Sequence, residues 1–337
     1  MAALWAARDV ATAALSALIC AGLIVLLRPT LRRYALAKPN ARSSHREPTP
    51  QGGGIAVVAA TAAAAAIGLF GFGAAVAAPL APLLAAVLLM AAVGVVDDVR
   101  SLDVAPRLLL QAVAIAIVLY GLPDNLRVIP VLPFSLERAL LFVGGLWFVN
   151  LVNFMDGIDW MTVAEVVPIA AALVLIGYLG ALPPEGRVVA LALGGAMIAF
   201  AWFNRPAATL FLGDVGSLPI GLVLGWLLVL LAGNGHLAAA LLLPLYYLAD
   251  TTITLFQRIA RRERVWQAHR SHFYQRATAR GLSVTDVIAR VLVVNVCLAA
   301  LAVATVIVPG RISGITALVA GVLLVTWLLA VLAKGRP

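Results

Sequence analysis

The chain has few charged residues and almost no cysteine. Charged residues make up only 12% of the 337 residues, whereas hydrophobic residues make up 63%. Soluble globular domains carry about 25% charged residues, so this composition excludes a soluble globular domain. The two cysteines, Cys20 and Cys297, both fall within long apolar stretches. Their number and placement exclude a disulfide framework and a cysteine-based metal cluster.

Long apolar runs take the place of the missing charge. A bilayer core about 30 Å thick needs about 20 mainly apolar residues for each helix, and the sequence contains about eleven such stretches. They lie near residues 10–27, 53–70, 79–96, 107–122, 138–154, 161–180, 187–203, 215–232, 236–255, 284–308 and 312–333. The sequence therefore predicts an all-α, polytopic membrane protein in which residues 1–337 form a single domain.

The basic residues predict the orientation of this bundle, because lysine and arginine near span ends stay in the cytoplasm. With the N-terminus outside and the C-terminus in the cytoplasm, only five of the 24 basic residues lie outside: Arg8, Arg127, Arg138, Arg187 and Arg311. The expected cytoplasmic loops lie near 28–52, 97–106, 155–160, 204–214 and 256–283. The net charge of +9 then reflects topology and contact with anionic headgroups, and it does not indicate nucleic acid. The first span is expected to stay in the mature protein, since three arginines follow it.

Two adjacent carboxylates, Asp97 and Asp98, end the third apolar stretch. An ionised group in hydrocarbon costs several kcal/mol, so a pair favours a place at the water interface and a bound cation. The alternative is a solvated helix end that Arg100 and Arg107 neutralise.

A second acidic set, Asp156 and Asp159, closes the fifth stretch together with Asn153. Residues three apart project from one side of a helical turn, and Gly157 gives the backbone between them freedom to turn. The alternative is a polar cap that satisfies the N–H groups of the next helix.

The third acidic element runs from Asn204 to Ser217 and contains Asp214 between Gly213 and Gly216. A helix begins here, and its free N–H groups and positive dipole end favour phosphate. Asp214 is a candidate metal ligand, with Asp97 and Asp98 as further candidates. Hard oxygen ligands of this kind suit Mg²⁺ or, as an alternative, Mn²⁺.

Two histidines, His269 and His272, lie three residues apart in the last basic loop. Beside Arg270 and aromatic residues they are candidates to hold a pyrophosphate and stack on a base or sugar ring. A lone histidine in a basic loop is more often a solvated surface residue.

These motifs together resemble the polyprenyl-phosphate N-acetylhexosamine-1-phosphate transferases, that is, glycosyltransferase family 4. Nearly the whole chain shares the ground plan, and the local phrases are closer to the lipopolysaccharide-initiating branch than to the phospho-N-acetylmuramoyl-pentapeptide transferases. The residues that carry the resemblance are Pro39, Asn40, Arg42, Ser43, His45, Pro50, Gly52, Gly53, Asp97, Asp98, Arg107, Gln111, Asn153, Asp156, Asp159, Asn204, Phe211, Gly213, Asp214, Gly216, Ser217, Asp250, Thr251, His269, Arg270, Ser271 and His272.

The resemblance implies a Mg²⁺-dependent enzyme of the inner membrane with its active site on the cytoplasmic face. A sugar 1-phosphate would pass from a UDP-activated amino sugar to polyprenyl phosphate with release of UMP, as the first step of a cell-envelope polysaccharide. Asp214 would bind the metal, with Asp97 and Asp98 near the metal and the lipid phosphate. The expected substrate-binding residues are Arg42, His45, Asn153, Asp156, Asp159, Asn204, His269, Arg270 and His272.

Several alternatives stay open at this point. A covalent aspartyl-phosphate route through Asp97 or Asp98 competes with direct attack by the lipid phosphate, which is favoured. A muropeptide transferase is the nearest competing function. A transporter would place its carboxylates near the bilayer midplane on broken helices, and an inactive scaffold is the third class. A homodimer is also left open.

Overall fold

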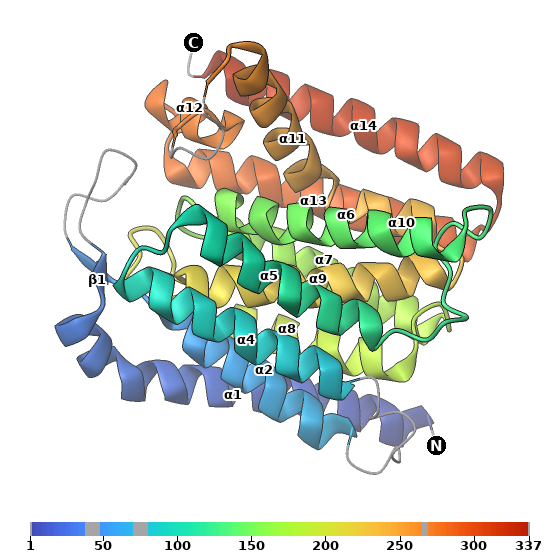
Figure 1. Ribbon diagram of the computed structural model, residues 1–337, viewed down its shortest axis with the longest axis horizontal. Helices are drawn as coiled ribbons and strands as arrows, with labels where there is room; N and C mark the ends of the chain where they lie inside the picture. The colour runs from blue at the N-terminus through green and yellow to red at the C-terminus, as the bar shows by residue number, and fades with distance from the viewer. Residues whose placement is uncertain (1, 38–47, 70–79, 264–268, 336–337) are drawn as a thin grey trace.

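The computed structural model describes residues 2–37, 48–69, 80–263 and 269–335, which fold almost entirely into helices (Figure 1). The helices are α1 (Ala2–Tyr34), α2 (Gly53–Leu69), α4 (Leu80–Val99), α5 (Val104–Tyr120), α6 (Phe134–Met155), α7 (Met161–Tyr178), α8 (Pro184–Phe203), α9 (Asp214–Gly233), α10 (Leu237–Leu242), α11 (Leu245–Ala260), α12 (Phe273–Ala279), α13 (Val284–Ile307) and α14 (Arg311–Lys334). A small antiparallel ribbon pairs β1 (Leu36–Ala37) with β2 (Thr49–Pro50). The all-α prediction is confirmed apart from this ribbon.

Eight of the described helices are long and apolar enough to cross a membrane. α2 and α5 are equally apolar but shorter, at 17 residues each. Large apolar side chains such as Leu18, Leu109 and Val293 are exposed on the outside of the bundle, where lipid can cover them. The prediction of a polytopic membrane protein is therefore confirmed.

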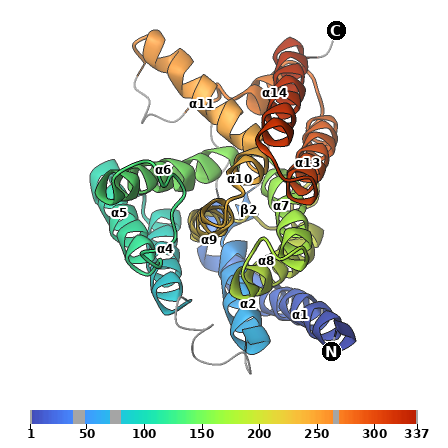
Figure 2. The same ribbon diagram turned by 90° about the vertical axis from the view of Figure 1, so that its right-hand side faces the viewer.

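The ninth predicted span, residues 236–255, is broken into two helices. α10 ends at Leu242, and α11 begins at Leu245 after a turn that contains Pro244. Proline has no N–H to donate to the preceding turn and its ring clashes with the carbonyl there. As a result α11 leaves the bundle instead of continuing α10 (Figure 2). The prediction of one continuous span was wrong here, and Pro244 was the signal against it.

α9 is the central helix of the bundle (Figure 2). Within its most apolar 18-residue window, 89% of the residues are buried, compared with 22% in α1. A helix that is apolar all round can lie in a protein core or face lipid, and the burial of α9 shows that other helices surround it. The side chains on the first turn of α9, including Asp214, are consequently held near the centre of the bundle.

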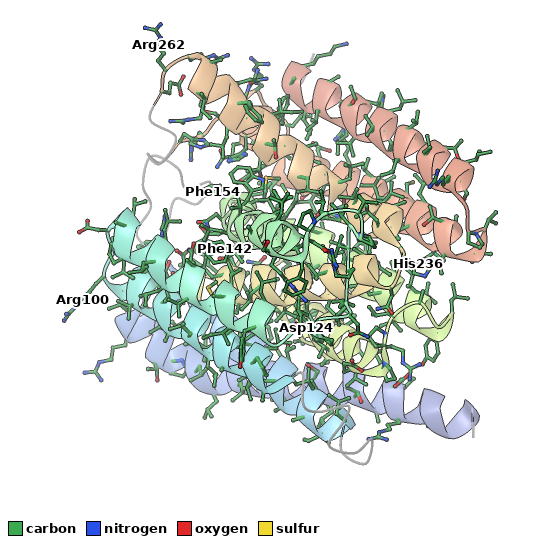
Figure 3. All side chains as sticks on the ribbon, turned by 45° about the vertical axis from the view of Figure 1, so that its right-hand side comes forward. Arg100, Asp124, Phe142, Phe154, His236 and Arg262 are labelled. Atoms are coloured by element: carbon green, nitrogen blue, oxygen red, sulfur yellow. The ribbon has the colours of Figure 1, made fainter. Side chains whose placement is uncertain are left out.

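The polar patches collect at one end of the bundle, where α4, α6 and α8 end and where α5, α7 and α9 begin. Arg100 and Arg262 lie at this end, whereas His236 lies at the opposite end (Figure 3). α1 continues to Tyr34, so its three arginines at 28, 32 and 33 lie on the helix and not in the loop expected near 28–52. The two chain termini lie at opposite ends of the molecule (Figure 1).

Candidate active site

Asp98, at the end of α4, caps the first turn of α9. Its two carboxylate oxygens accept the backbone N–H groups of Asp214 and Val215, at 2.9 and 3.1 Å. A helix start leaves N–H groups without partners and carries a partial positive charge, so an anionic cap satisfies both. Gly213 precedes this turn with φ of +76°, and a Cβ there would lie 2.5 Å from the Asp98 carboxylate. Glycine is required at that position.

Close contacts with two further glycines fix the place of this turn. A Cβ on Gly94 of α4 would lie 2.3 Å from the nitrogen of Val215, and a Cβ on Gly54 of α2 would lie 2.2 Å from the Cα of Gly216. The end of the first loop is tied to the same segment, because the N–H of Phe211 donates to Pro50 and Gly53 donates back to Phe211. Segments far apart in sequence thus meet at the start of α9.

Asp97 and Asp214 bring their carboxyl groups together at this point. One oxygen of Asp97 accepts the N–H of Leu102 at 2.6 Å, and the other forms an ion pair with Arg107 at 2.9 Å. The side chain of Asp214 is within hydrogen-bonding contact of Asp97. Asn153 of α6 donates to Asp214 at 2.8 Å and to the hydroxyl of Ser217 at 2.9 Å. The helices α4, α5, α6 and α9 therefore converge on one acidic point.

Two carboxyl groups in contact repel one another unless a proton or a cation lies between them. Asp97 and Asp214 provide such a pair, and the Asn153 amide beside them offers a neutral oxygen. Within the ranges that the structure describes, no group of three His, Cys, Asp or Glu side chains is arranged to hold a metal ion. The two adjacent aspartates differ in what they contact on α9, since Asp98 accepts backbone N–H groups there, whereas the Asp97 carboxyl group meets the side chain of Asp214.

Asp156 lies directly after α6, on the loop that leads to α7. The hydroxyl of Thr162 donates to its carboxylate. Burial is the largest of the effects that raise the pKa of Asp156 to about 6; the Thr162 hydrogen bond opposes it, and the charges of Asp98 and Asp159 add to it. This carboxyl group is therefore close enough to the acidic point to respond to its charge.

Asp159 and Asn204 are buried and shape the neighbouring loops. Asp159 accepts the N–H of Ala208 at 3.0 Å. Asn204 accepts the N–H of Trp160 at 2.8 Å and donates to the carbonyl of Leu210 at 3.0 Å. These contacts position the loops around the site, and direct binding of substrate by these two residues stays a prediction.

The histidine loop docks against the same end of the bundle. Tyr274 donates its hydroxyl hydrogen to the carbonyl of Phe154 at 3.1 Å, and a Cβ on Gly157 would lie only 2.0 Å from that hydroxyl. His269, Arg270 and His272 immediately precede this contact. The loop thus lies beside the segment that carries Asp156. Arg42 and His45 fall outside the described residues, so their expected roles stay predictions.

The structure adds polar residues that the sequence interpretation did not place in the site. Asp250 on α11 is fully buried and contacts the histidine loop. Gln111 accepts a hydrogen bond from Asn150 at 2.7 Å and joins α5 to α6. Glu165, buried in α7, accepts a hydrogen bond from Asn295 at 2.6 Å. Each is a polar residue inside an otherwise apolar stretch, which is the pattern by which sequence alone could have found it.

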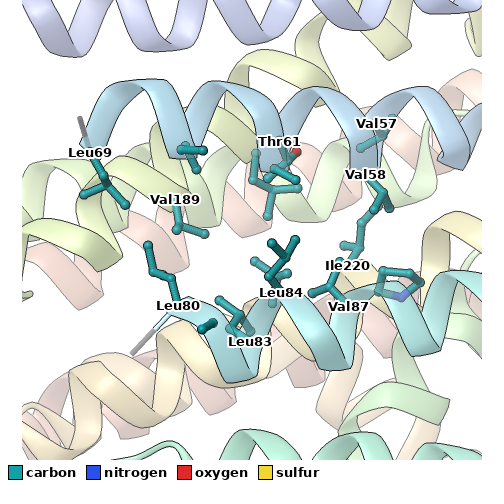
Figure 4. Close-up of a pocket in the computed structure, with 17 residues that line it drawn as sticks. Val57, Val58, Thr61, Leu69, Leu80, Leu83, Leu84, Val87, Val189 and Ile220 are labelled. Atoms are coloured by element: carbon teal, nitrogen blue, oxygen red, sulfur yellow. The ribbon is translucent and has the colours of Figure 1, made fainter. Parts of the chain in front are cut away.

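An apolar cavity of about 670 Å³ lies between α2, α4, α8 and α9 (Figure 4). All of its lining residues are apolar except Thr61. Representative lining residues are Val57, Thr61, Leu83, Val87, Val189 and Ile220. A second apolar cavity, of about 240 Å³, adjoins α5, α6 and α9. Apolar cavities thus lie on both sides of the helix that carries Asp214.

Comparison with known proteins finds a similar enzyme and a matching family model. The chain is 25% identical over 279 residues to the "Probable undecaprenyl-phosphate N-acetylglucosaminyl 1-phosphate transferase" of Bacillus subtilis (strain 168), which covers 77% of this chain and 75% of the relative. A family model also matches the part of the chain that contains Asp97, Asp98, Asn153 and Asp214. That part, residues 80–232, is similar to Glycosyl transferase family 4.

Proposed function

We propose that the protein transfers an N-acetylhexosamine 1-phosphate from a UDP-sugar to polyprenyl phosphate and releases UMP. The observation that carries this proposal is the contact between the Asp97 and Asp214 carboxyl groups, with Asn153 beside them, at the start of the central helix. The similarity to the probable undecaprenyl-phosphate N-acetylglucosaminyl 1-phosphate transferase of Bacillus subtilis and the family match over the same residues support it.

The donor set fits a divalent cation of the Mg²⁺ type, with Mn²⁺ as the alternative. Mg²⁺ is usually held by one or two carboxylates and shares its remaining positions with waters and substrate phosphates. Asp97 and Asp214 would hold it, and of the adjacent aspartates the orientation favours Asp97. When bound, such an ion neutralises charge on the diphosphate of the donor.

The chain's own residues then bind and orient the reactants. An oxygen of the lipid phosphate attacks the phosphorus that carries the sugar, a new P–O bond forms, and the bond to UMP breaks with the electron pair leaving on UMP. A phosphate monoester is largely ionised at pH 7, so direct attack needs no strong base. Arg107 supplies positive charge beside Asp97, and Asp98 keeps the first turn of α9 in register.

The proposed acceptor is a lipid, which agrees with the surroundings of the site. The carboxylates lie at the ends of membrane-length helices, and apolar cavities adjoin α9 below them. The hydrocarbon chain of a lipid acceptor is stabilised by contact with apolar surface at that depth. A water-soluble acceptor would gain little from such contact. A transporter would instead place its polar site near the midplane.

We further propose that the site faces the cytoplasm at the plasma membrane, since the end that carries Arg100 and Arg262 (Figure 3) is rich in basic residues. There the product would begin a cell-envelope polysaccharide such as lipopolysaccharide O-antigen, an enterobacterial-type antigen or teichoic acid. UDP-N-acetylglucosamine is the first donor to test, because the Bacillus subtilis relative is named as a probable N-acetylglucosaminyl 1-phosphate transferase.

The test is UMP release by purified protein in detergent, with Mg²⁺, polyprenyl phosphate and a panel of UDP-N-acetylhexosamines. We expect release that requires the lipid, is abolished by a chelator and is lost in Asp214→Asn. Asp124→Asn, on the loop at the opposite end of the bundle, is the matched control and should behave as the wild type. Absence of turnover with every donor in folded protein, or full activity in Asp214→Asn, would refute the proposal.

A further inference from the structure

Asp250, on the helix that leaves the bundle, carries a buried carboxyl group that the histidine loop contacts. Its carboxylate accepts the backbone N–H groups of Phe273 and Tyr274, at 3.1 and 3.4 Å, and lies 3.1 Å from Nδ1 of His272. The remaining partners are the hydroxyls of Tyr246 and Thr254. A buried carboxylate is tolerated when donors surround it in this way. The Asp250 side chain therefore fastens the segment that begins α12 to α11.

These contacts assign the protons of the two histidines. A carboxylate that accepts backbone N–H groups has only acceptor positions to offer, so Nδ1 of His272 must carry a proton. Nδ1 of His269, in contrast, accepts the N–H of Ser271 at 3.3 Å, which leaves the ring proton of neutral His269 on Nε2. The two neighbouring rings hold opposite tautomers, each set by the hydrogen bond that its Nδ1 makes.

The rings also differ in depth. His272 is 2% exposed, and its ring stacks against His269 at 5.0 Å between centroids and against Tyr274 at 5.8 Å. His269 is only half-buried. His272 therefore forms the inner layer and His269 the outer layer of one stack. The stack is fixed to the candidate site, because Tyr274 donates to the carbonyl of Phe154.

We propose that Asp250 and His272 are positioning residues that hold His269 as the phosphate-binding histidine of this loop. His269 would contact a substrate phosphate through Nε2–H, and His272 would touch no substrate. This assignment rests on the proposed transferase function. It gives different roles to two histidines that the sequence alone treats as equivalent. In this proposal, Asp250 orients the His272 ring, and His272 in turn orients His269.

The tautomers can be measured without any turnover. The chain has four histidines, so ¹⁵N-histidine labelling gives few signals, and His269→Gln and His272→Gln assign two of them. We expect the signals lost in His272→Gln to come from a ring protonated at Nδ1, and those lost in His269→Gln to come from a ring protonated at Nε2. A His272 ring that carries its proton only at Nε2 would overturn the proposal.

Amide substitutions test the roles in the UMP-release assay, because the Asn amide nitrogen can take the place of Nδ1–H and the Gln amide nitrogen that of Nε2–H. His272→Asn should keep more activity than His272→Gln, whereas His269→Gln should keep more than His269→Asn, each by about 10-fold, the lower end of the range for lost orienting partners. Equal effects of Asn and Gln at both positions, or the reverse order, would refute the division of roles.

Asp250→Asn extends the test to the anchor itself. We expect it to lower kcat/KM by about 10- to 100-fold and to shift the His272 signals, because the carboxylate that fixes Nδ1–H is lost. Asp286→Asn is the matched control, since Asp286 also accepts a backbone N–H at a helix start but is exposed and lies on α13. Unchanged kcat/KM in Asp250→Asn would contradict the proposal. An inactive wild type would count against the transferase function alone, while the tautomer measurement would still decide the histidine assignment.

Discussion

An alanine at position 94 would test whether the carboxylates must be held together by direct contact between α4 and α9. A Cβ on Gly94 would lie 2.3 Å from the nitrogen of Val215 and 2.4 Å from the carbonyl carbon of Asp214. Carbon atoms prefer separations of about 3.5 to 4 Å, and backbone atoms of a helix cannot rotate aside. The two helices must therefore separate by about 1 Å at the point where Asp98 caps α9.

The expected loss falls on activity much more than on stability. A misplacement of about 1 Å in an active site costs about 100-fold in rate, so we expect turnover of Gly94→Ala to fall by about that factor. Overpacking costs about 1 to 3 kcal/mol of unfolding free energy, and replacement of glycine by alanine within a helix returns about 1 kcal/mol. The net change in stability should therefore be about 0 to 2 kcal/mol.

UMP release and thermal unfolding in detergent, measured on the same preparation, separate these effects. Gly22→Ala is the matched control, because a Cβ on Gly22 of α1 would meet no atom within 4 Å. We expect that variant to be fully active and slightly more stable. Wild-type turnover in Gly94→Ala would show that the separation of α4 and α9 does not limit the reaction, and would refute this reasoning.

Substitutions at three other positions test contacts at the same end of the bundle and inside it. Asp98→Ala should lower the free energy of unfolding by about 1 to 2 kcal/mol, as loss of a helix cap does, whereas Asp98→Asn keeps an oxygen acceptor and should lose less; equal thermal stability of the two would contradict the capping role. Because burial raises the pKa of Asp156 from 3.8 to about 6, its protonation stabilises the folded protein below pH 3.8, and this contribution is lost as the pH rises through 6. Asp156→Asn should therefore be more stable than the wild type at pH 7.5 by about 1 to 2 kcal/mol, after allowance for solvent screening, with a smaller gain at pH 5; a gain independent of pH would argue against the raised pKa. Asn295→Leu should cost about 1 to 3 kcal/mol because it removes the donor to buried Glu165, and an unchanged melting temperature would show that this hydrogen bond contributes little.

The sequence predicted the helical spans well because the bilayer imposes one strong constraint. Backbone groups in hydrocarbon must be satisfied within helices, so apolar length alone located a helix at every predicted span among the described residues. Pro244 was the exception. Its effect depended on whether the neighbouring helices continue past it, and hydropathy carries no such information.

Residue identity predicted less about the site than about the spans. The sequence singled out Asp97, Asp98 and Asp214, and the structure brings them together at the start of α9. It could not distinguish Asp97 from Asp98, because adjacent residues on a helix point about 100° apart and only the packed neighbours decide which one meets Asp214. Asp250 was not named as a site residue, because its contacts with the histidine loop join residues 22 to 24 positions apart in the chain.

Because α9 is central but late in the chain, the helices that pack against it are synthesised before it. Asp98 and its partner nitrogen on Asp214 are 116 residues apart, and chains are synthesised from the N-terminus at about 5 to 20 residues per second. α2, α4 and α6 are therefore made on the order of 10 seconds before the helix against which they pack. During that interval the bundle lacks its central helix, and Asp98 of α4 and the glycines of α2 and α4 lack the α9 backbone that they contact. Truncation before residue 214 would leave a bundle without the helix around which the others pack.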